Sequence, residues 1–345
     1  MNEEKISLSF KEGGSDKVYM ASLENKTGSW EVNFAYGRRG NSLTTGCKGN
    51  NLSYGAAKKI FDKLVKEKTG KGYKDENQTF NVIHTPANSN TDSGHRPQLL
   101  NEMDEADIQK YLDNDGWCMQ EKWDGKNRLL IKDGDIVIGT NRKGIIVGIT
   151  DDIKQELSTL PDCVLADEDL GDKVMIFDII SLKTGYNTRI TEVTKLLKNC
   201  TKLIPTNTFY DKKDKVHALK LFKKNNHEGV VFKQLDAYYT PGRPASGGSQ
   251  LKFKFTTTCS VIAGDVNKGK RSVSMFVFNN KLKIHVGNVT IYPNQEIPKN
   301  GDILEIKYLY FFKEGSLFQP VYLGQRTDLD EEDCTLKQLK YKKED

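Results

Sequence analysis

A lysine that could act as a covalent nucleophile stands in the short run Lys122-Trp123-Asp124-Gly125. A deprotonated lysine amine is a good nucleophile, and nearby positive charge or a metal ion favours that form. The α-phosphorus of a bound nucleoside triphosphate would be a suitable electrophile. Because an Asp-Gly pair is also common at the centre of a β-turn, these four residues alone do not establish a catalytic site.

Six further short motifs follow this lysine in a fixed order, and the ordered set is far more specific than any member. They are Asn141-Arg142-Lys143-Gly144, Asp167-Glu168, Met175-Ile176-Phe177-Asp178, Glu228-Gly229-Val230-Val231-Phe232-Lys233, Leu251-Lys252-Phe253-Lys254 and Gln325-Arg326-Thr327-Asp328. Over about residues 97–330 the series resembles the covalent nucleotidyltransferases: ATP-dependent DNA ligases, RNA ligases and capping enzymes. Tyr239-Thr240-Pro241-Gly242-Arg243 resembles the Y-x-P-G-x-R stretch of DNA ligases.

The resemblance implies that Lys122 attacks ATP and carries AMP as a phosphoramide. It implies catalytic roles for further charged residues, namely Asp124, Lys252, Lys254, Arg326 and Asp328. Lys252 and Lys254 are two residues apart, so on a strand they point to the same face, and in the family such a pair contacts the α-phosphate. The alternative is an exposed basic face of a strand.

A divalent metal ion, Mg²⁺ or Mn²⁺, is expected as a cofactor beside the phosphates. Glu228 resembles the motif carboxylate that helps to hold the ion, and Asp124 is the second candidate ligand. Carboxylate and phosphate oxygens suit Mg²⁺, which usually keeps several waters. The alternative for Glu228 is a turn from a helix into a strand.

Three residues are expected to bind the nucleoside. Glu168 matches the glutamate that accepts hydrogen bonds from the ribose hydroxyls, but it lies between Asp167 and Asp169, so the assignment could shift by one residue. Phe177 matches an aromatic residue that stacks on adenine, although its apolar surroundings also suit an ordinary core residue. Gln120, two residues before the lysine, is the third.

Arginines are the candidates for DNA contact in this part of the chain. Arg142 matches an arginine that in DNA ligases contacts the nick phosphates or nearby DNA, and Arg128 and Arg243 are further candidates. A surface arginine in a hairpin is the alternative for Arg142. In the family, the motif that contains Arg326 and Asp328 orients the pyrophosphate leaving group as a C-terminal barrel closes over the nucleotide.

Several positions depart from the family pattern. Asn127 stands where an arginine is common, and Arg128 follows it. A shift of one residue on a strand sends the side chain to the other face, so either the strand bulges or the role is met differently. Leu251 replaces a tryptophan, Leu329 replaces a lysine, and Leu317-Phe318-Gln319-Pro320 lacks an arginine.

The N-terminal block carries a second resemblance. Tyr36-Gly37-Arg38-Arg39-Gly40 resembles the W-G-R-x-G signature of WGR domains, and Glu67-Lys68-Thr69-Gly70-Lys71-Gly72-Tyr73 resembles their closing sequence. WGR domains of poly(ADP-ribose) polymerases contact DNA near a break. Here Arg38, Arg39 and Lys48 could bind phosphates, while Tyr36 or Trp30 could pack on sugar or base. A core aromatic and hairpin-capping arginines are the alternative.

Hydrophobic patterns predict strands and a few helices around these motifs. Predicted strands are 5–10, 17–24, 29–36, 128–132, 136–139, 173–180, 229–233, 261–263, 272–278, 282–286, 303–309 and 321–324. Predicted helices are 53–66, capped by Ser53, 104–112, and segments around Ile190–Leu197 and Val216–Phe222. The C-terminal tail is expected to be a charged, solvated end.

The expected fold is therefore a multidomain α+β protein. Its parts are a WGR-like sheet-and-helix module at 1–75, a polar linker at 76–97, an ATP-grasp-like nucleotidyltransferase domain at 98–255 and a β-barrel of the OB-fold at 256–345. Four or more separated strands with turn residues between them favour the barrel. We see no internal repeat.

Composition sets the protein class. The 345 residues carry a net charge of +5, which suits a phosphate-rich partner without requiring one. No apolar run approaches the ~20 residues that span a bilayer, and the six cysteines lack zinc-site spacing, so we expect reduced thiols in an intracellular, cytoplasmic or nucleoid-associated protein.

The sequence thus predicts a monomeric ATP-dependent DNA ligase acting on nicked duplex DNA, with no membrane partner. An RNA ligase is the nearest alternative. A DNA-end-binding protein with an inactive nucleotidyltransferase domain is the alternative of another class, and Asn127 and Leu329 are its support.

Overall fold

The computed structural model describes residues 2–12, 15–26, 28–39, 43–76, 83–84, 89–313 and 315–342. The chain divides into two compact units. The first runs to Leu219 and includes Val230–Phe253, and the second comprises Lys220–Gly229 and the chain from Lys254 on. Within the described residues, no helix has the length and apolar character needed to cross a membrane.

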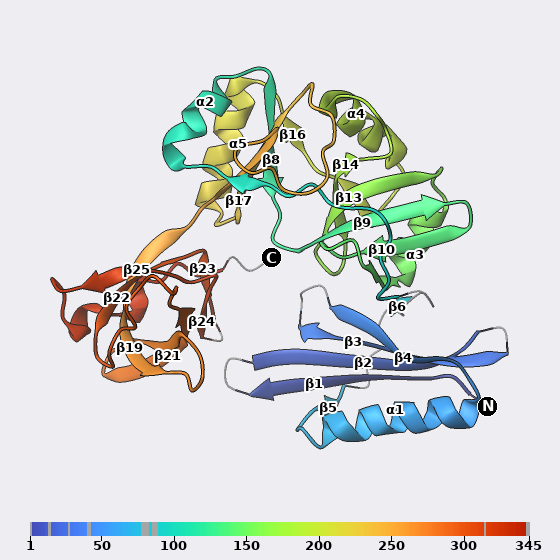
Figure 1. Cartoon of the computed structure of the whole chain (residues 1–345), viewed down its shortest axis with the longest axis horizontal. Helices are drawn as coiled ribbons and strands as arrows, with labels where there is room; N and C mark the ends of the chain where they lie inside the picture. The colour runs from blue at the N-terminus through green and yellow to red at the C-terminus, as the bar shows by residue number, and fades with distance from the viewer. Residues whose placement is uncertain are drawn as a thin grey trace. The chain divides into compact units, whose positions relative to one another are not determined.

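The N-terminal part of the first unit is an antiparallel sheet with one helix on its face (Figure 1). The sheet has the order β4-β3-β2-β1-β5, formed by β1 (Glu4–Glu12), β2 (Ser15–Lys26), β3 (Ser29–Arg38), β4 (Thr44–Leu52) and β5 (Lys74–Asp75). Helix α1 (Tyr54–Thr69) begins after Ser53, whose hydroxyl accepts a hydrogen bond from the Ala56 amide. Its apolar stripe, including Ala57, Phe61 and Leu64, packs on buried strand residues such as Leu8 and Val32.

The next part is built on two sheets. The first has the order β11-β10-β9-β13-β14-β15, formed by β9 (Lys126–Asp133), β10 (Ile136–Thr140), β11 (Ile146–Val147), β13 (Cys163–Asp169), β14 (Val174–Ile179) and β15 (Leu203–Pro205). Helices α3 (Asp151–Ser158) and α4 (Tyr186–Leu196) pack on one face, where residues such as Leu130, Leu165 and Ile176 form the core. A two-stranded ladder joins β6 (Ile83–His84) to β12 (Ile149–Thr150).

The second sheet has the order β16-β8-β17-β18-β7. Its strands are β7 (Asn101–Glu102), β8 (Trp117–Lys122), β16 (Thr208–Phe209), β17 (Gly229–Gln234) and β18 (Gln250–Lys254). The short helix α2 (Ile108–Leu112), preceded by the 3₁₀ turn η1 (Glu105–Asp107), and helix α5 (Lys212–Lys224) lie beside it (Figure 1). The buried ammonium of Lys215 joins α5 to the α2 end by donating to the carbonyls of Tyr111, Asn114 and Trp117 at 2.9–3.1 Å.

The second unit is almost entirely antiparallel sheet. Its order is β21-β20-β19-β22-β25, formed by β19 (Thr257–Val266), β20 (Ser272–Asn279), β21 (Leu282–Thr290), β22 (Ile303–Tyr308) and β25 (Val321–Arg326). A separate hairpin pairs β23 (Tyr310–Phe312) with β24 (Ser316–Phe318). The edge strands β21 and β25 approach one another, but the strand pairing among the described residues does not close the sheet into the expected barrel.

The elements follow the sequence predictions in many places, but several elements were not predicted. Among these are the strands of the candidate site, β8, β13 and β18, and the short strands β7, β11, β12, β15, β16, β23 and β24. Strand β4 and helix α3 were not predicted, since TTGCKGNNL is polar and rich in glycine and α3 has only 8 residues. The C-terminal tail is not a solvated end as far as Lys342. It forms η3 (Leu336–Gln338), and Leu339 is buried. It then bonds through Lys340 to Tyr308 and Phe255, so the prediction for the tail was wrong up to this point.

The predicted linker is only partly visible. Residues 77–82 and 85–88 lie outside the described residues. Its later part is anchored to the turn before β11, because Asp92 forms a bridge with Ile145 and the Ser93 amide donates to the Gly144 carbonyl.

Candidate active site

The directions of the strands bring Lys122 on β8 and Lys252 on β18 to the same end of the second sheet. The Leu235 amide bonds to the Gly116 carbonyl and the Cys118 thiol to the Lys233 carbonyl, so β17 runs antiparallel to β8. Bonds from Gln234 to Ser249 and from Phe255 to Glu228 make β18 antiparallel to β17. The end of β8, the start of β17 and the end of β18 therefore lie together. The predicted motifs that contain Lys122, Glu228 and Lys252 therefore lie at the same end of this sheet.

The loop after Lys122 is held against the neighbouring sheet. The Gly125 amide donates to Glu168 Oε1 at 3.3 Å. A Cβ at position 125 would press into the carbonyl oxygen of Asp169, so only glycine allows this approach. The Asp-Gly pair thus does more than turn the chain, because it fixes the loop of the candidate nucleophile Lys122 beside Glu168, the expected ribose-binding residue.

The alternation of β13 separates the three neighbouring carboxylates. Asp167 and Asp169 are buried on one face, and the Asp169 carboxylate pairs with Arg128 at 2.7 Å. Burial raises the pKa of Asp167 well above its usual value, and its two oxygens have no hydrogen-bond partner within the described residues. Glu168 points to the opposite face, toward Gly125, and is partly exposed. The geometry favours Glu168 over its neighbours.

The pairing register of β9 and β13 shows whether β9 contains a bulge at Asn127. Strands β9 and β13 pair without a shift from Cys163↔Lys132 to Asp169↔Lys126, so β9 does not bulge here. Asn127 lies opposite Glu168 on the other face of β9 and is half-buried, whereas Arg128 is 7% exposed and ion-paired. Contact of Arg128 with DNA stays a prediction, and it would require this pair to break.

The two candidate base-binding residues are held in different ways. Phe177, on β14, is half-buried beside Leu129 and Ala166. Gln120 is 1% exposed, and its Nε2 donates to the Thr208 hydroxyl at 2.9 Å, which in turn donates to the Thr206 carbonyl at 3.3 Å. This chain of donors fixes the orientation of the amide, so its oxygen is the atom left to accept a hydrogen bond.

A buried carboxylate and a lysine lie at the β17 and β18 ends. Glu228 is 6% exposed, and its Oε1 lies 3.6 Å from the Lys254 ammonium. Lys254 also donates to Gln319 at 2.5 Å, while Lys252 and Asp124 are half-buried. Carboxylates such as Glu228 and Asp124, together with substrate phosphates, are the oxygen donors that Mg²⁺ uses in proteins. The donor types fit the expected metal.

The last motif forms a pre-set ion pair at the end of β25. Arg326 donates to both oxygens of Asp328, at 2.7 and 2.6 Å, and this contact lowers the pKa of Asp328 to about 2. Leu329 packs against a small apolar cluster with Ile262 and Ile303. The residue in the place of the family's lysine therefore serves the core.

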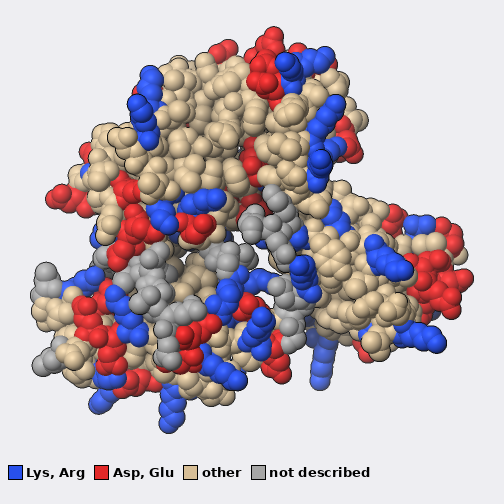
Figure 2. Space-filling model, turned by 180° about the vertical axis from the view of Figure 1, so that it is seen from behind, with Lys and Arg blue, Asp and Glu red and all other residues tan. Residues whose placement is uncertain are grey.

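Unlike the buried Arg128, the other two candidate DNA-contacting arginines of this region, Arg142 and Arg243, are exposed. Arg142 lies in the turn between β10 and β11. Arg243 donates to the Leu100 carbonyl and to Asn101 Oδ1. Acidic and basic side chains are mixed over much of the face shown in Figure 2, so the net positive charge does not single out one binding surface there.

In the N-terminal domain, Tyr36 is the aromatic residue available to a ligand. Its ring is 46% exposed and stacks with Phe34 at 6.2 Å between centroids, while Lys48 lies 5.3 Å over the Phe34 ring. Trp30 is 5% exposed and belongs to the core, so its predicted packing on sugar or base was wrong.

The paired arginines beside Tyr36 differ in their surroundings. Arg39 is engaged by Asp16 and Glu76, and Arg38 is half-buried. Either could bind a phosphate, but Arg39 would exchange existing ion pairs to do so.

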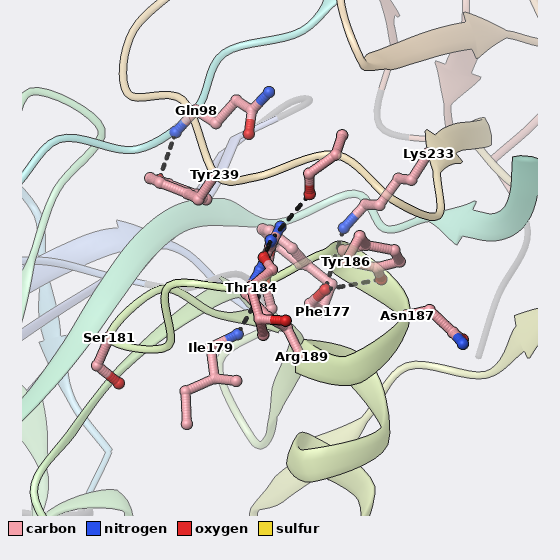
Figure 3. Close-up of polar contacts among 12 residues, drawn as sticks. Gln98, Phe177, Ile179, Ser181, Thr184, Tyr186, Asn187, Arg189, Lys233 and Tyr239 are labelled. Atoms are coloured by element: carbon pink, nitrogen blue, oxygen red, sulfur yellow. Dashed lines mark hydrogen bonds and ion pairs between the residues drawn. The ribbon is translucent and has the colours of Figure 1, made fainter.

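Sequence reasoning missed a group of buried polar residues beside Phe177. Figure 3 shows Lys233, Tyr186 and Arg189 directed toward β14. Arg189 and Asp178 form an ion pair in which both side chains are 1% exposed. Lys233 closes one of the quoted motifs, so its position was a signal, whereas Tyr186 and Arg189 carried none.

Comparisons with known proteins agree with this architecture. Residues 4–80 match the WGR domain family, so the N-terminal part of the chain is a WGR domain. The chain is similar to the structure Pmar-Lig_Pre, with a TM-score of 0.55 and 18% identity over 67% of each chain. It is also similar to a structure from a structure–function analysis of Lig E DNA ligases, with a TM-score of 0.53 and 14% identity over 67% of this chain and 99% of that chain.

The ligase domain of M. tuberculosis LigD matches with a TM-score of 0.40 and 21% identity, over 70% of this chain and 97% of that chain. No curated protein matches the chain. At these identities, the similarities to Pmar-Lig_Pre and to the Lig E structure establish a shared fold.

Proposed function

We propose that the protein is an ATP-dependent DNA ligase that seals nicks between a 3′-hydroxyl and a 5′-phosphate in duplex DNA. The observation that carries the proposal is the position of Lys122. It is the last residue of β8, at the end of the sheet where β18, which carries Lys252, also ends, and the Gly125 amide of the following loop donates to Glu168. The fold shared with Lig E DNA ligases supports it.

In the first step, the Lys122 amine attacks the α-phosphorus of ATP. A P–N bond forms, the bond to the pyrophosphate oxygen breaks, and the amine loses a proton. Lys252 and Lys254 offset the charge on the α-phosphate, because phosphoryl transfer is catalysed mainly by positioning and electrostatic stabilisation. Arg326 and Asp328 orient the leaving pyrophosphate, and the unit that carries them is proposed to be an OB-fold barrel.

Nucleotide selection is assigned to three strand residues, the buried Gln120 and the half-buried Glu168 and Phe177. The Gln120 amide oxygen is positioned as an acceptor, which suits an amino group on a purine. Glu168 accepts from the ribose hydroxyls, and Phe177 stacks on the base.

Glu228 and Asp124 would hold the metal ion. When bound, Mg²⁺ or Mn²⁺ neutralises phosphate charge and orients the triphosphate. The Lys254 ammonium beside Glu228 keeps this carboxylate from carrying an isolated buried charge.

In the second step, a 5′-phosphate oxygen attacks the phosphorus of Lys122–AMP, the P–N bond breaks, and a DNA-adenylate forms. In the third, the 3′-hydroxyl attacks the 5′-phosphate and AMP leaves.

Arg142 and Arg243 are proposed to contact DNA near the nick. Tyr36, Arg38 and Arg39 are proposed to bind DNA through the WGR domain. We also propose the domain division 1–75, 76–97, 98–255 and 256–345.

The test is incubation with α-labelled ATP and Mg²⁺, beside Lys122→Ala, followed by nicked DNA or nicked RNA. Label should attach to the wild type only and should leave it as nicked DNA is sealed. If only RNA is joined, the protein is an RNA ligase. If no label attaches while DNA binding persists, it is a DNA binder with an inactive domain, as Asn127 on the face of Glu168 would favour.

A further inference from the structure

Lys233 is buried in a place that is costly for a charged group. Its side chain lies at the end of β17, and the residue is 2% exposed. The ammonium donates to the carbonyl oxygen of Phe177 at 3.0 Å, across 56 residues of sequence. Burial lowers the pKa of Lys233 to about 8. Moving a charge out of water is unfavourable unless its surroundings compensate.

The nearby Asp178 carboxylate and two aromatic rings offset part of this cost. The Lys233 ammonium lies 4.5 Å from the centroid of the Phe177 ring and 4.5 Å from that of Tyr186. The Tyr186 hydroxyl donates to the same Phe177 carbonyl at 3.0 Å. A cation over a ring face is attracted to its π electrons, and the attraction grows when water is excluded. Figure 3 shows these three side chains directed toward one another.

A second buried lysine in the same unit shows what a purely structural role looks like. Lys215 is fully buried, and its ammonium has three carbonyl acceptors, those of Tyr111, Asn114 and Trp117. Each N–H of an ammonium can donate once, so Lys215 is satisfied by backbone alone. Lys233 has one such acceptor among the described residues and uses the Phe177 and Tyr186 rings for the rest.

We propose that Lys233 is a positioning residue of the nucleotide site, which fixes the ring and the backbone of Phe177 for stacking on the base. The inference rests on the proposed function. Lys233 is on β17, which pairs with β8, the strand that carries Lys122. Phe177 is on β14, which pairs with β13, the strand that carries Glu168. The contact therefore sets the spacing between the strand of the nucleophile and the strand that holds the base. The ammonium covers one side of the ring and leaves the base to the other.

The experiment compares the full-length wild type with Lys233→Met, Lys233→Arg and Lys215→Met. Self-adenylation with α-labelled ATP gives KM and kcat, and inorganic tripolyphosphate serves as a competing ligand without a base. Lys233→Met should raise the KM for ATP roughly tenfold, as expected for a lost aromatic contact. Inhibition by tripolyphosphate should change less than about twofold, because the phosphate site is intact. Lys233→Arg should restore part of the ATP affinity, since a guanidinium also binds ring faces.

Lys215→Met is the matched control, because it removes a buried ammonium that is held by three backbone carbonyls and that the proposal does not place in the nucleotide site. It should lower the free energy of unfolding and leave both the KM for ATP and the inhibition by tripolyphosphate unchanged. If Lys233→Met does not fold, Tyr186→Phe, which removes only the second donor to Phe177, should raise the KM for ATP in the same selective way. Equal weakening of ATP and tripolyphosphate, or an unchanged KM, would overturn the inference. If the wild-type protein is not labelled by α-labelled ATP, that result contradicts the proposed ligase function and not this inference alone.

Discussion

At the scale of single residues, the molecule places charged groups where only specific partners make them tolerable. Lys215 satisfies its charge with three carbonyls, and Asp169 pairs with Arg128. Lys233 relies on two rings and one carbonyl. The residues beside the proposed nucleotide site are thus less completely paired than those that only hold the fold, which is common at functional sites.

The buried charge of Lys233 predicts a dependence of stability on pH. The pKa is lowered from 10.5 to about 8 in the folded chain. Below pH 8 both states hold the proton, and the folded state carries the full cost of burying it. Between about pH 8 and 10.5 the unfolded state binds more protons, so the free energy of unfolding rises with pH. The size is on the order of 3 kcal/mol.

Urea unfolding of wild type and Lys233→Met at pH 7.5 to 9.5 measures this effect. The wild type should gain stability relative to the variant as pH rises. The groups that face the ammonium, Asp178, Tyr186, Arg189 and Cys118, are the same in both proteins and cancel in the difference. Parallel pH profiles would show that the ammonium is not buried as described.

The Thr208 hydroxyl predicts a change in base selection. It accepts from Gln120 Nε2 and donates to Thr206, so it holds the amide with its oxygen free. Thr208→Val removes that restraint and allows the amide to present a donor to guanine. The ratio of self-adenylation to self-guanylation, measured with labelled ATP and GTP, should fall by roughly tenfold. An unchanged ratio would mean that Gln120 does not select the base. Thr191→Val, at an exposed helix position, is the control.

At the scale of elements, strand β14 and helix α4 are joined by the ion pair of Asp178 and Arg189. Arg189 Nε and Nη2 donate to the two carboxylate oxygens at 2.7 and 3.1 Å, and its Nη1 donates to the Ala237 carbonyl at 2.9 Å. The pair therefore fixes the helix, the strand that carries Phe177 and the loop before Tyr239.

Removal of one partner should be strongly destabilising. Arg189→Met leaves the buried Asp178 carboxylate without its ion-pair partner, and we expect a loss of about 3–5 kcal/mol in the free energy of unfolding. The control is Lys195→Met, which removes an exposed pair with Glu192 and should cost less than about 1 kcal/mol. Chemical denaturation of both variants measures the difference. Similar small losses in the two would contradict the role given to Arg189.

At the scale of the whole molecule, two parts of the chain have separate tasks in the proposed function. The WGR domain has its own core of strand residues and α1, and none of the proposed nucleotide-binding residues lies in it. Its exposed Tyr36 and the nearby Lys48 suit a nucleic acid backbone or base.

Deletion of residues 1–75 should weaken the binding of nicked DNA and leave self-adenylation within about twofold of wild type. A phosphate-binding contribution from this domain should also appear as a reduced dependence of DNA affinity on salt. Fluorescence anisotropy at two salt concentrations and the labelling assay measure the two effects. Loss of labelling in a folded truncation would contradict the separation of tasks.

The sequence by itself determined the features that depend on neighbours along the chain. The periodicity of Ala57, Phe61 and Leu64 and the cap at Ser53 were enough to predict α1. The two-residue spacing of Lys252 and Lys254 was enough to predict that they share a face if the segment is a strand, and the structure makes it strand β18. Local geometry alone fixes such relations, because side-chain period and capping act over a few residues.

Only the tertiary structure decided which face and which partner each site residue has. It placed Glu168 on the face of β13 opposite to the buried Asp167 and Asp169, with Gly125 as its partner. Tertiary packing buries Arg128 and Trp30. It also places the Lys233 ammonium against the carbonyl oxygen and the ring of Phe177. The physical reason is that burial and charge pairing arise between segments distant in sequence, so the residue types permit several outcomes and the packed sheets select one.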